Sequence, residues 1–410
     1  MISSASELGL SSVINNEESI RYIRSLGSFT SNLSNARKEA IKLKKLEIAR
    51  LLKRTLKEAY DDISSVNGTE SFERILAKAE VPIYEFSNSI EQGNAPKKMG
   101  SNINEYLNFL QENRNRKVGI SSGYFKYDDA IGGGFRRKTV SLIGARLKTG
   151  KSILADNIGI YTSGNLNIPT LLLDTEMTLE DHQTRLLAYF SRIPINVIES
   201  ARFDINELAK VQEASAKIAR LNYDYESIAG AEFEDILSIA RRWTVREVGT
   251  ENGRTKDCLI IYDYLKLMNQ SNVSGNLAEH QVLGFQISEL HNFTVKYDVP
   301  VLSFVQLNRD GITRDSTDVV SQSDRLLWLC TNFSIYRVKS EEEIAIDGLE
   351  NGTHKLIPLV SRHGPGMSDG NYINMHMQGQ YAMIGEGQTA SQVRTCGNQA
   401  FDNTVDDDEL

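Results

Sequence analysis

Residues 139–153 read Thr139-Val-Ser-Leu-Ile-Gly-Ala-Arg-Leu-Lys-Thr-Gly-Lys-Ser-Ile153. An apolar run is followed by a short loop that ends in Gly-Lys-Ser, and then by a second apolar stretch that begins at Ile153. This order of strand, loop and helix is the setting of a phosphate-binding loop, in which consecutive backbone N–H groups and a helix N-terminus surround an anion. The stretch therefore predicts a nucleotide-binding α/β domain.

The residue types in this loop suit a bound phosphate. Gly150 permits close approach of the backbone, Lys151 neutralises the charge of the β- and γ-phosphates, and the Ser152 hydroxyl can ligate Mg²⁺. The first Gly of the general pattern is replaced by Ala145, directly after Gly144. We predict that ATP binds here together with Mg²⁺. The residues expected to contact the nucleotide are Ala145, Arg146, Thr149, Gly150, Lys151, Ser152 and Ile153.

A second stretch, Thr170-Leu-Leu-Leu-Asp-Thr-Glu-Met177, is typical of a buried strand that ends in two carboxylates. At the carboxyl edge of a parallel sheet, where ligands sit, a carboxylate could orient and deprotonate the water that attacks ATP. Glu176 is our candidate for this catalytic role. The alternative is that Asp174 or Glu176 only caps the helix that follows.

Two further strands end in polar residues that could meet the same edge. Cys258-Leu-Ile-Ile-Tyr-Asp263 has the form of a Walker B motif, in which Asp263 would hold Mg²⁺ directly or through water. The next strand ends at Gln306, whose amide can donate to the γ-phosphate and report its loss to the loop that follows. The alternative for Gln306 is that it only caps a helix or turn.

The composition is that of a globular protein without a basic character. Of the 410 residues 40% are hydrophobic and 24% are charged, and the net charge is −8, so any contact with DNA has to be local. The three cysteines lack metal-ligand spacing, and their odd number indicates a reducing compartment. No stretch approaches the ~18 apolar residues of a membrane span, and the start of the chain lacks a signal-peptide pattern. We therefore predict a cytoplasmic protein without a membrane role.

The spacing of apolar residues along the chain changes near Gly119. Before it, helical apolar spacing predicts helices over 35–62, over 71–80 and over 103–110, the second of which should end or kink at Pro82. After it, short β-type runs alternate with helical stretches, which predicts a parallel sheet covered by helices. The predicted strands are 139–143, 170–173, 258–262, 301–305, 325–330, 334–338 and 355–360.

Taken in order, these motifs resemble the C-terminal motor domain of the ring-shaped DnaB-type replicative helicases, over about residues 119–385. Residues 119–128 resemble the family's lead-in to the phosphate loop, and the family has Ala at the position of Ala145. The other matching pieces are Glu176-Met177 with a catalytic Glu-Met pair, Asp263-Tyr264-Leu265 with the Walker B motif, and Gln306-Leu-Asn-Arg309 with the Gln sensor.

The resemblance implies a RecA-like P-loop NTPase core, an α/β fold with a mostly parallel twisted sheet flanked by helices. A small all-α N-terminal region, shorter than that of the family, and a linker helix precede this core. The domains expected from the resemblance are an N-terminal helical region over 1–92, a linker with a docking helix over 93–117, the motor domain over 118–387, and an acidic, disordered tail over 388–410.

The resemblance also implies an arginine finger. Ser361-Arg-His-Gly-Pro365 resembles the family segment that carries it, which assigns Arg362 to the active site of a neighbouring subunit. A finger supplied in this way stabilises the charge of the transition state. The family usually has a Lys two residues before that Arg, whereas this chain has Val360, so one cation at the phosphates is missing or comes from elsewhere.

The family's DNA-gripping loops correspond here to residues 269–276 and 310–322. Arg309 and Arg314 are the candidates to hold phosphates of single-stranded DNA, although residues 316–322 do not match the family's loop. The resemblance further implies a homo-hexamer with ATP sites at its subunit interfaces, and a helicase loader as partner. A separate primase is implied because no primase-like cluster precedes the motor. The cell would be bacterial or phage-infected.

The sequence thus predicts an ATP-dependent replicative DNA helicase that translocates on single-stranded DNA and unwinds the duplex at the fork. Two alternatives share the same core. A RecA-like recombinase would be expected to carry the full Gly pattern in its phosphate loop, and a DNA-independent regulatory ATPase is permitted by the net charge of −8. Stimulation of ATP hydrolysis by single-stranded DNA separates the last alternative from the other two.

Overall fold

The structure is a computed structural model, and it separates into two compact units, residues 1–96 and 97–410. The described residues are 21, 33–91, 98–112, 118–251, 254–265, 279–307 and 330–395.

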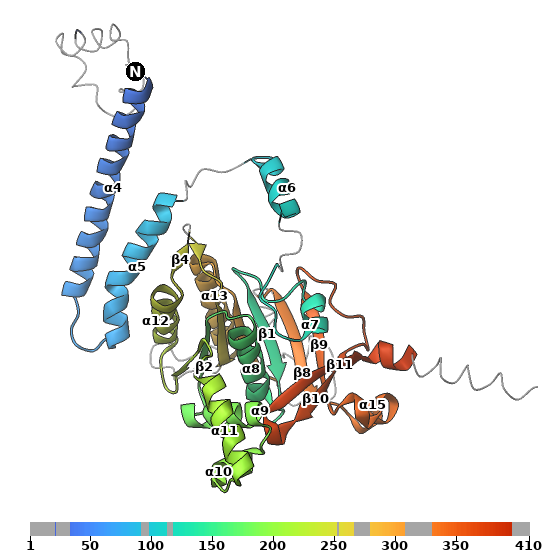
Figure 1. Cartoon of the computed structure of the whole chain (residues 1–410). Helices are drawn as coiled ribbons and strands as arrows, with labels where there is room; N and C mark the ends of the chain where they lie inside the picture. Colours follow the sequence, from blue (N-terminus) through green and yellow to red (C-terminus); the bar gives the residue numbers. More distant parts are fainter. Residues whose placement is uncertain are drawn as a thin grey trace, which may run out of the picture. The chain divides into compact units, whose positions relative to one another are not determined.

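The first unit contains a helical hairpin, formed by α4 (Leu33–Ser64) and α5 (Phe72–Glu91), which pack against each other (Figure 1). The helix predicted over 35–62 is confirmed as α4. The next helix was predicted to end or kink at Pro82; it does not end there, because α5 continues through this residue to Glu91. Proline removes one backbone hydrogen bond from a helix, and the packing of α5 against α4 offsets that loss.

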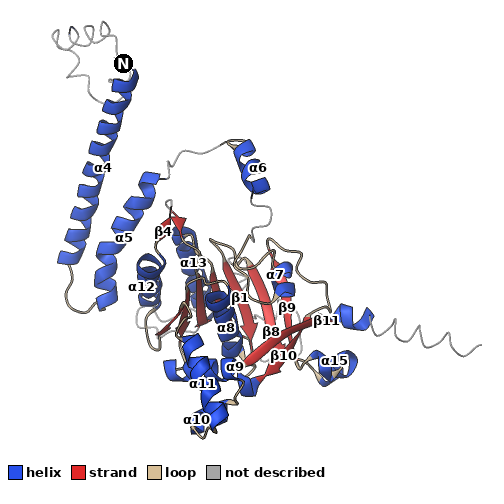
Figure 2. Ribbon diagram, viewed as in Figure 1, coloured by secondary structure: helices blue, strands red, loops and turns tan. Residues whose placement is uncertain are grey.

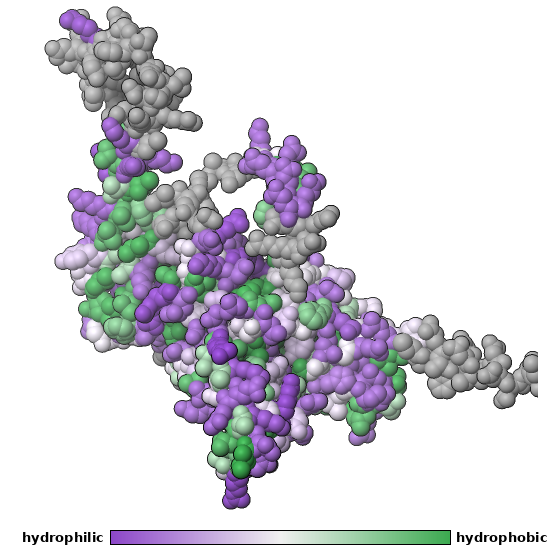
Figure 3. All heavy atoms as spheres, viewed as in Figure 1, coloured by the Kyte–Doolittle hydropathy of each residue, from purple (hydrophilic) through white to green (hydrophobic). Residues whose placement is uncertain are grey.

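Apolar side chains are exposed along α4. Leu43, Leu46 and Tyr60 are 68%, 56% and 69% exposed, respectively. Figure 3 shows hydrophobic residues gathered on the surface of this hairpin. An apolar surface of this kind marks a place where another protein surface can pack.

The second unit begins with α6 (Ile103–Glu112), which confirms the helix predicted over 103–110. None of its residues is buried. Its apolar side chains Ile103, Tyr106, Leu107 and Leu110 are all exposed.

The centre of the second unit is a nine-stranded sheet with the order β11-β10-β9-β8-β1-β7-β6-β2-β3 (Figures 1 and 2). The strands from β8 to β3 are parallel to one another, while β9, β10 and β11 follow in antiparallel pairs. The strands are β1 (Val140–Ala145), β2 (Thr170–Asp174), β3 (Tyr223–Ser227), β6 (Leu259–Leu265), β7 (Val301–Gln306), β8 (Asn332–Val338), β9 (His354–Ser361), β10 (Ile373–Gln378) and β11 (Met383–Thr389). A separate two-stranded ribbon pairs β4 (Thr250–Glu251) with β5 (Arg254–Thr255).

Helices cover the sheet. They are α7 (Phe125–Ala130), α8 (Lys151–Ile160), α9 (Leu179–Ser191), α10 (Ile195–Ser200), α11 (Ile205–Ile218), α12 (Phe233–Trp243), α13 (Glu279–Tyr297) and α15 (Glu341–Asp347). All of these except α7 and α15 lie between parallel strands in the chain. Crossovers between parallel strands are right-handed, so α8 and α9, which contact each other, lie on one face and α12 and α13, which also contact each other, lie on the other.

The core lies between the sheet and these helices. Ile143 of β1, Leu172 of β2 and Ile261 of β6 are fully buried together with Leu154 and Ile158 of α8. Fully burying a side chain of this size contributes about 1.5–3 kcal/mol each to folding. The apolar runs in the sequence therefore become the central strands, as the parallel pattern predicts.

The predicted α/β fold with a mostly parallel sheet is confirmed. Six of the predicted strands are present as β1, β2, β6, β7, β8 and β9. The strand predicted over 325–330 lies, except for Cys330, outside the described residues. Three strands of the large sheet, β3, β10 and β11, were not predicted, and neither were the two strands of the ribbon, β4 and β5.

Candidate active site

The loop between β1 and α8 has the backbone that a phosphate-binding loop requires. Gly150 has φ +83°, in the left-handed region, and a Cβ at this position would lie 2.7 Å from Cε of Met377. Any other residue would therefore be strained by this backbone conformation, and the end of the Met377 side chain would have to move aside. Inside the loop, the Thr149 hydroxyl donates to the Arg146 carbonyl at 2.8 Å, and Arg146 donates to the Leu307 carbonyl at 3.2 Å.

The hairpin of β10 and β11 brings Met377 to this loop. The Asn157 side chain of α8 donates to the Ala382 carbonyl at 2.8 Å and accepts from the Ile384 backbone N–H at 3.0 Å. These two bonds hold the hairpin against α8, beside the phosphate-binding loop. Met377 was not predicted, because it comes from a strand near the end of the chain without a local signal.

A cavity of about 300 Å³ opens beside the loop. It collects residues from the ends of several strands and from α9. The lining residues are Ala145, Arg146, Leu147, Lys148, Gly150, Lys151, Ser152, Ile153, Glu176, Arg185, Gln306 and Met377. All of the residues predicted to contact the nucleotide except Thr149 line this cavity, and Thr149 is buried.

Lys151, Ser152 and Asp263 meet beside the cavity. The Ser152 hydroxyl donates to Oδ2 of Asp263 at 2.7 Å, and Nζ of Lys151 lies 2.6 Å from Oδ1 of the same carboxylate. Burial raises the pKa of Asp263, although Lys151 and Ser152 offset part of this effect. Mg²⁺ in nucleotide sites is held by one or two protein oxygens, phosphate oxygens and water. A hydroxyl next to a carboxylate fits this requirement.

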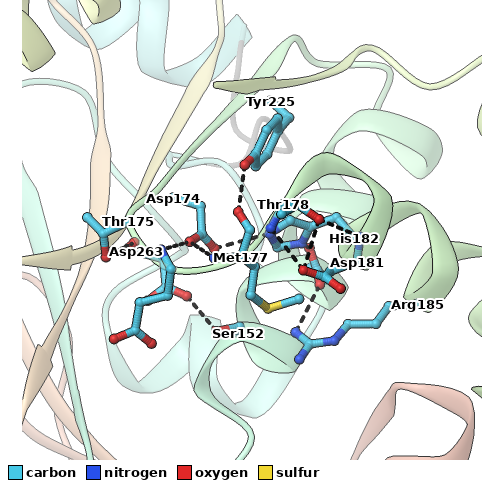
Figure 4. Close-up of polar contacts among 12 residues, drawn as sticks. Ser152, Asp174, Thr175, Met177, Thr178, Asp181, His182, Arg185, Tyr225 and Asp263 are labelled. Carbon is cyan, nitrogen blue, oxygen red and sulfur yellow. Dashed lines mark hydrogen bonds and ion pairs between the residues drawn. The ribbon is translucent and has the colours of Figure 1, made fainter. Parts of the chain in front are cut away.

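Glu176 lies between Thr175 and Met177, in a turn after β2 that is anchored on three sides. Figure 4 shows the neighbouring residues Asp174, Thr175 and Met177. Oδ1 of Asp174 accepts the backbone N–H of Glu176 at 2.6 Å and that of Met177 at 2.8 Å. The Thr175 backbone N–H donates to the Asp263 carbonyl at 3.0 Å, and the Tyr225 hydroxyl donates to the Met177 carbonyl at 2.6 Å. The exposed Glu176 side chain lines the cavity.

The alternative of a helix cap does not describe Asp174 or Glu176. The N-cap of α9 is Thr178, which forms a capping box with Asp181. Asp174 instead holds the turn that carries Glu176. Neither carboxylate at the end of β2 is therefore committed to capping the helix.

Gln306 ends β7 at the level of Ala145 on β1, according to the register of the two strands. Its exposed side chain lines the cavity. One site is therefore formed at the carboxyl ends of four neighbouring strands of the sheet, β1, β7, β6 and β2. The predicted DNA contacts Arg309 and Arg314 lie outside the described residues.

Arg362 lies near the amino ends of the parallel strands, opposite the edge that carries the cavity. β9 runs antiparallel to β8, and its last residue, Ser361, pairs with Asn332, which in turn pairs with Ser141 near the start of β1. The phosphate-binding loop follows the opposite end of β1, on the order of 15 Å or more away along the strands. Arg362 is exposed and does not line the cavity described above.

Arg185 and His182 of α9 lie near the site and were also not predicted. Arg185 lines the cavity together with Glu176. One turn earlier on the same helix, His182 is buried against Asp156 of α8. No sequence spacing links these residues to the phosphate-binding loop, because they come together only when α9 packs on α8.

Comparison with known proteins agrees with this geometry. Residues 119–322 match the family model described as the DnaB-like helicase C-terminal domain. The matched region is a DnaB-like helicase C-terminal domain. It contains the phosphate-binding loop, Glu176, Asp263 and Gln306, so the resemblance seen in the motifs is confirmed.

Individual relatives of the DnaB-like domain are distant. The replicative DNA helicase DnaB of Treponema pallidum is 24% identical over 267 residues, which cover 64% of this chain and 56% of that protein. The chain spans about half the length of the curated relatives that it matches.

Two solved structures share the fold. One, described as an ATPase domain, is 20% identical with a TM-score of 0.59, covering 70% of this chain and 99% of that one. A DnaB-like replicative helicase, described with its interactions with primase, is 16% identical with a TM-score of 0.60, covering 93% of this chain and 86% of that one. Among the described helices, none is both long and apolar enough to cross a membrane.

Proposed function

We propose that this chain is an ATP-hydrolysing replicative DNA helicase, which forms a hexameric ring, moves along single-stranded DNA and unwinds the duplex at the fork. The observation that carries the proposal is the division of the site between two edges of one sheet. Lys151, Asp263, Glu176 and Gln306 gather at the carboxyl edge, while Arg362 lies at the opposite edge. The match of the domain to DnaB-like helicases supports the same activity.

The residues at the carboxyl edge have separate tasks in this proposal. Lys151 and the N–H groups of the loop bind the β- and γ-phosphates of ATP. Ser152 and Asp263 hold Mg²⁺, which when bound neutralises charge on the phosphates. Glu176 orients the attacking water and accepts its proton. Gln306 donates to the γ-phosphate and passes its loss to the chain that follows β7.

Arg362 serves the site of a neighbouring subunit. It cannot reach the phosphates bound by its own chain, because the length of the sheet separates the two. A ring in which each subunit presents this edge to the next would bring Arg362 to a γ-phosphate. The exposed apolar side chains of α6 and α4 favour such self-association. Val360 supplies no second cation beside Arg362.

Single-stranded DNA is the proposed track, held by the loops after β6 and β7 with Arg309 and Arg314. A separate primase and a helicase loader are proposed as partners. One structural neighbour is described with its primase interactions, which supports the first of these partners. The relatives are bacterial proteins, which favours the cytoplasm of a bacterial or phage-infected cell as the location.

The test is ATP hydrolysis by the purified chain, with and without single-stranded DNA, together with the mass of the assembly in the same buffer with Mg·ATP. A six-fold assembly whose turnover rises with DNA is the expected result. A rate that does not respond to DNA would contradict the helicase and favour a regulatory ATPase. Long filaments on DNA would favour a recombinase instead.

A further inference from the structure

A buried histidine joins the phosphate-binding helix to the turn that carries Glu176. Nδ1 of His182 lies 2.8 Å from Oδ1 of Asp156 on α8, and Nε2 lies 3.1 Å from Oδ2 of Asp174 at the end of β2. The histidine side chain is 5% exposed, and those of Asp156 and Asp174 are 1% and 2% exposed. Figure 4 shows His182 on α9, close to the turn that follows Asp174.

Asp174 uses both carboxylate oxygens in this arrangement. Oδ2 faces His182, while Oδ1 accepts the backbone N–H groups of Glu176 and Met177. A carboxylate held at one oxygen by a ring and at the other by a turn transmits the position of the ring to that turn. The orientation of Glu176 therefore depends on His182 through a single intermediate side chain.

The charges around His182 favour its doubly protonated form. Asp156 faces it from α8, Asp174 from β2, Tyr225 from β3, and Asp181 and Arg185 lie on its own helix. Burial alone would lower the pKa of His182, but the hydrogen bonds to Asp156 and Asp174 outweigh burial and raise this pKa to about 9. Near neutral pH both ring nitrogens can therefore donate.

Packing alone would not require this cluster. Buried ion pairs have a large desolvation cost, and apolar residues of similar size often stabilise a core as well or better. The main core on the same elements is built from apolar side chains such as Leu154 and Ile158 of α8 and Leu172 of β2. The hydrogen bonds of the His182 cluster fix the orientation of the Asp174 carboxylate, which apolar contacts would not do.

We propose that His182 is a positioning residue for ATP hydrolysis, which holds Asp174, and through it Glu176, at a fixed place relative to the helix that begins with Lys151 and Ser152. This inference rests on the proposed role of Glu176 as the group that activates water. Asp156 holds His182 from the side of α8. Asp174 connects His182 to the turn that carries Glu176. His182 itself does not line the nucleotide cavity.

Two conservative substitutions separate positioning from packing. In H182Q the amide nitrogen can take the place of Nε2 and still donate to Asp174, whereas in H182N it can take the place of Nδ1 and donate to Asp156 alone. ATPase kcat and KM of the full chain, measured with single-stranded DNA, are compared with the binding of a fluorescent ATP analogue and with the melting temperature. We expect kcat to fall roughly tenfold or more in H182N, to stay within about threefold of wild type in H182Q, and nucleotide binding to be unchanged in both.

Equal kcat values in the two variants, or losses that follow their melting temperatures, would overturn the proposal. If H182N does not fold, D156L/H182L takes its place, because this pair removes the charges of His182 and Asp156 together. Asp174 then keeps only the backbone N–H donors of Glu176 and Met177. The expected result is a folded protein with the same loss of kcat. A folded pair variant with wild-type kcat would equally overturn the proposal.

E176Q separates this inference from the proposed function. If E176Q hydrolyses ATP at the wild-type rate, Glu176 is not the activating group and both fail. If E176Q is inactive while H182N equals wild type, the inference alone fails. In the combined variant E176Q/H182N we expect no loss beyond that of E176Q, since His182 acts through Glu176; a further loss would show another route and would contradict the proposal.

Discussion

The backbone N–H of Arg362 donates to the carbonyl of Thr331 at 3.0 Å. Thr331 is the residue before β8, so this bond fixes Arg362 beside the start of the parallel strands. The phosphate-binding loop follows the far end of β1, after Ala145. The length of the strands sets the distance between Arg362 and the phosphate-binding loop of the same chain, so movement of a side chain does not close it.

From this separation we predict that two inactive variants restore each other. K151A lacks the lysine proposed to bind the phosphates and R362A lacks the proposed finger, so each alone should lose about 10³-fold or more in ATPase kcat. When both are co-expressed, an R362A subunit can receive Arg362 from a K151A neighbour. Roughly a quarter of the interfaces in a random ring are then intact, and ATP hydrolysis should reappear.

The control is each variant expressed alone and assembled to the same mass as wild type. If the mixed assembly forms and stays as inactive as its components, Arg362 does not act in the site of a neighbour. Recovery in the mixture cannot come from either chain alone, because each lacks one essential group.

The second prediction concerns Mg²⁺ at Asp263. In D263N the buried carboxylate that meets Ser152 and Lys151 becomes a neutral amide. We expect the Mg²⁺ concentration that gives half-maximal ATPase activity to rise by about tenfold or more. D369N, which alters an exposed aspartate in the loop after β9, is the matched control and should not shift the Mg²⁺ titration. An unchanged titration for D263N would exclude Asp263 as a metal ligand.

Much of the fold was predictable because the central strands are buried on both faces. Strands such as Leu259–Leu265 and Val301–Gln306 are near-continuous apolar runs, and parallel packing makes such runs recognisable. The strand Tyr223–Ser227 alternates aromatic and polar residues at the edge of the sheet, and its sequence signal is correspondingly weak. Ile373–Gln378 mixes apolar and polar residues in the same way.

In the candidate site, too, the residues with a local sequence pattern could be predicted and those brought together only by packing could not. The phosphate-binding loop is a local pattern, and the ends of β2, β6 and β7 could be assigned to it because parallel strands share an edge. The bridge from Asp156 through His182 to Asp174 has no local pattern, since each residue taken alone is ordinary in its own element. Only the packing of α9 on α8 and β2 brings these three side chains together.

The third prediction is a loss of stability on the alkaline side. The pKa of His182 is raised from 6.5 in the unfolded chain to about 9 in the folded protein. Its stabilisation is therefore complete below pH 6.5, declines as the pH rises towards 9, and is absent above it. The shift corresponds to about 3 kcal/mol. Urea unfolding between about pH 6 and 10 should show this decline in wild type and a smaller one in D156L/H182L; parallel curves would contradict the prediction.

The last prediction concerns Gln306, which lies between the nucleotide cavity and the chain that leads to the proposed DNA loop. Its side chain lines the cavity, and its neighbour Leu307 is buried and accepts a hydrogen bond from Arg146 of the phosphate-binding loop. Removing the amide takes away one donor to the γ-phosphate, so the DNA-free rate should fall, but hydrolysis should persist because Lys151 and Glu176 remain in place. The response to DNA should be lost, because the γ-phosphate no longer has a donor on β7.

The measurement is the ratio of ATPase rates with and without single-stranded DNA in Q306A. We expect this ratio to fall to about one. Coupling between two sites typically changes a property by roughly 5- to 150-fold, and the loss of the Gln306 amide should remove that effect. Q378A is the matched control, because Gln378 also ends a strand at the carboxyl edge, is exposed and does not line the cavity. A Q306A variant that keeps the wild-type ratio would show that β7 does not carry the signal, and the coupling would then have to run through β6 and the chain after Asp263.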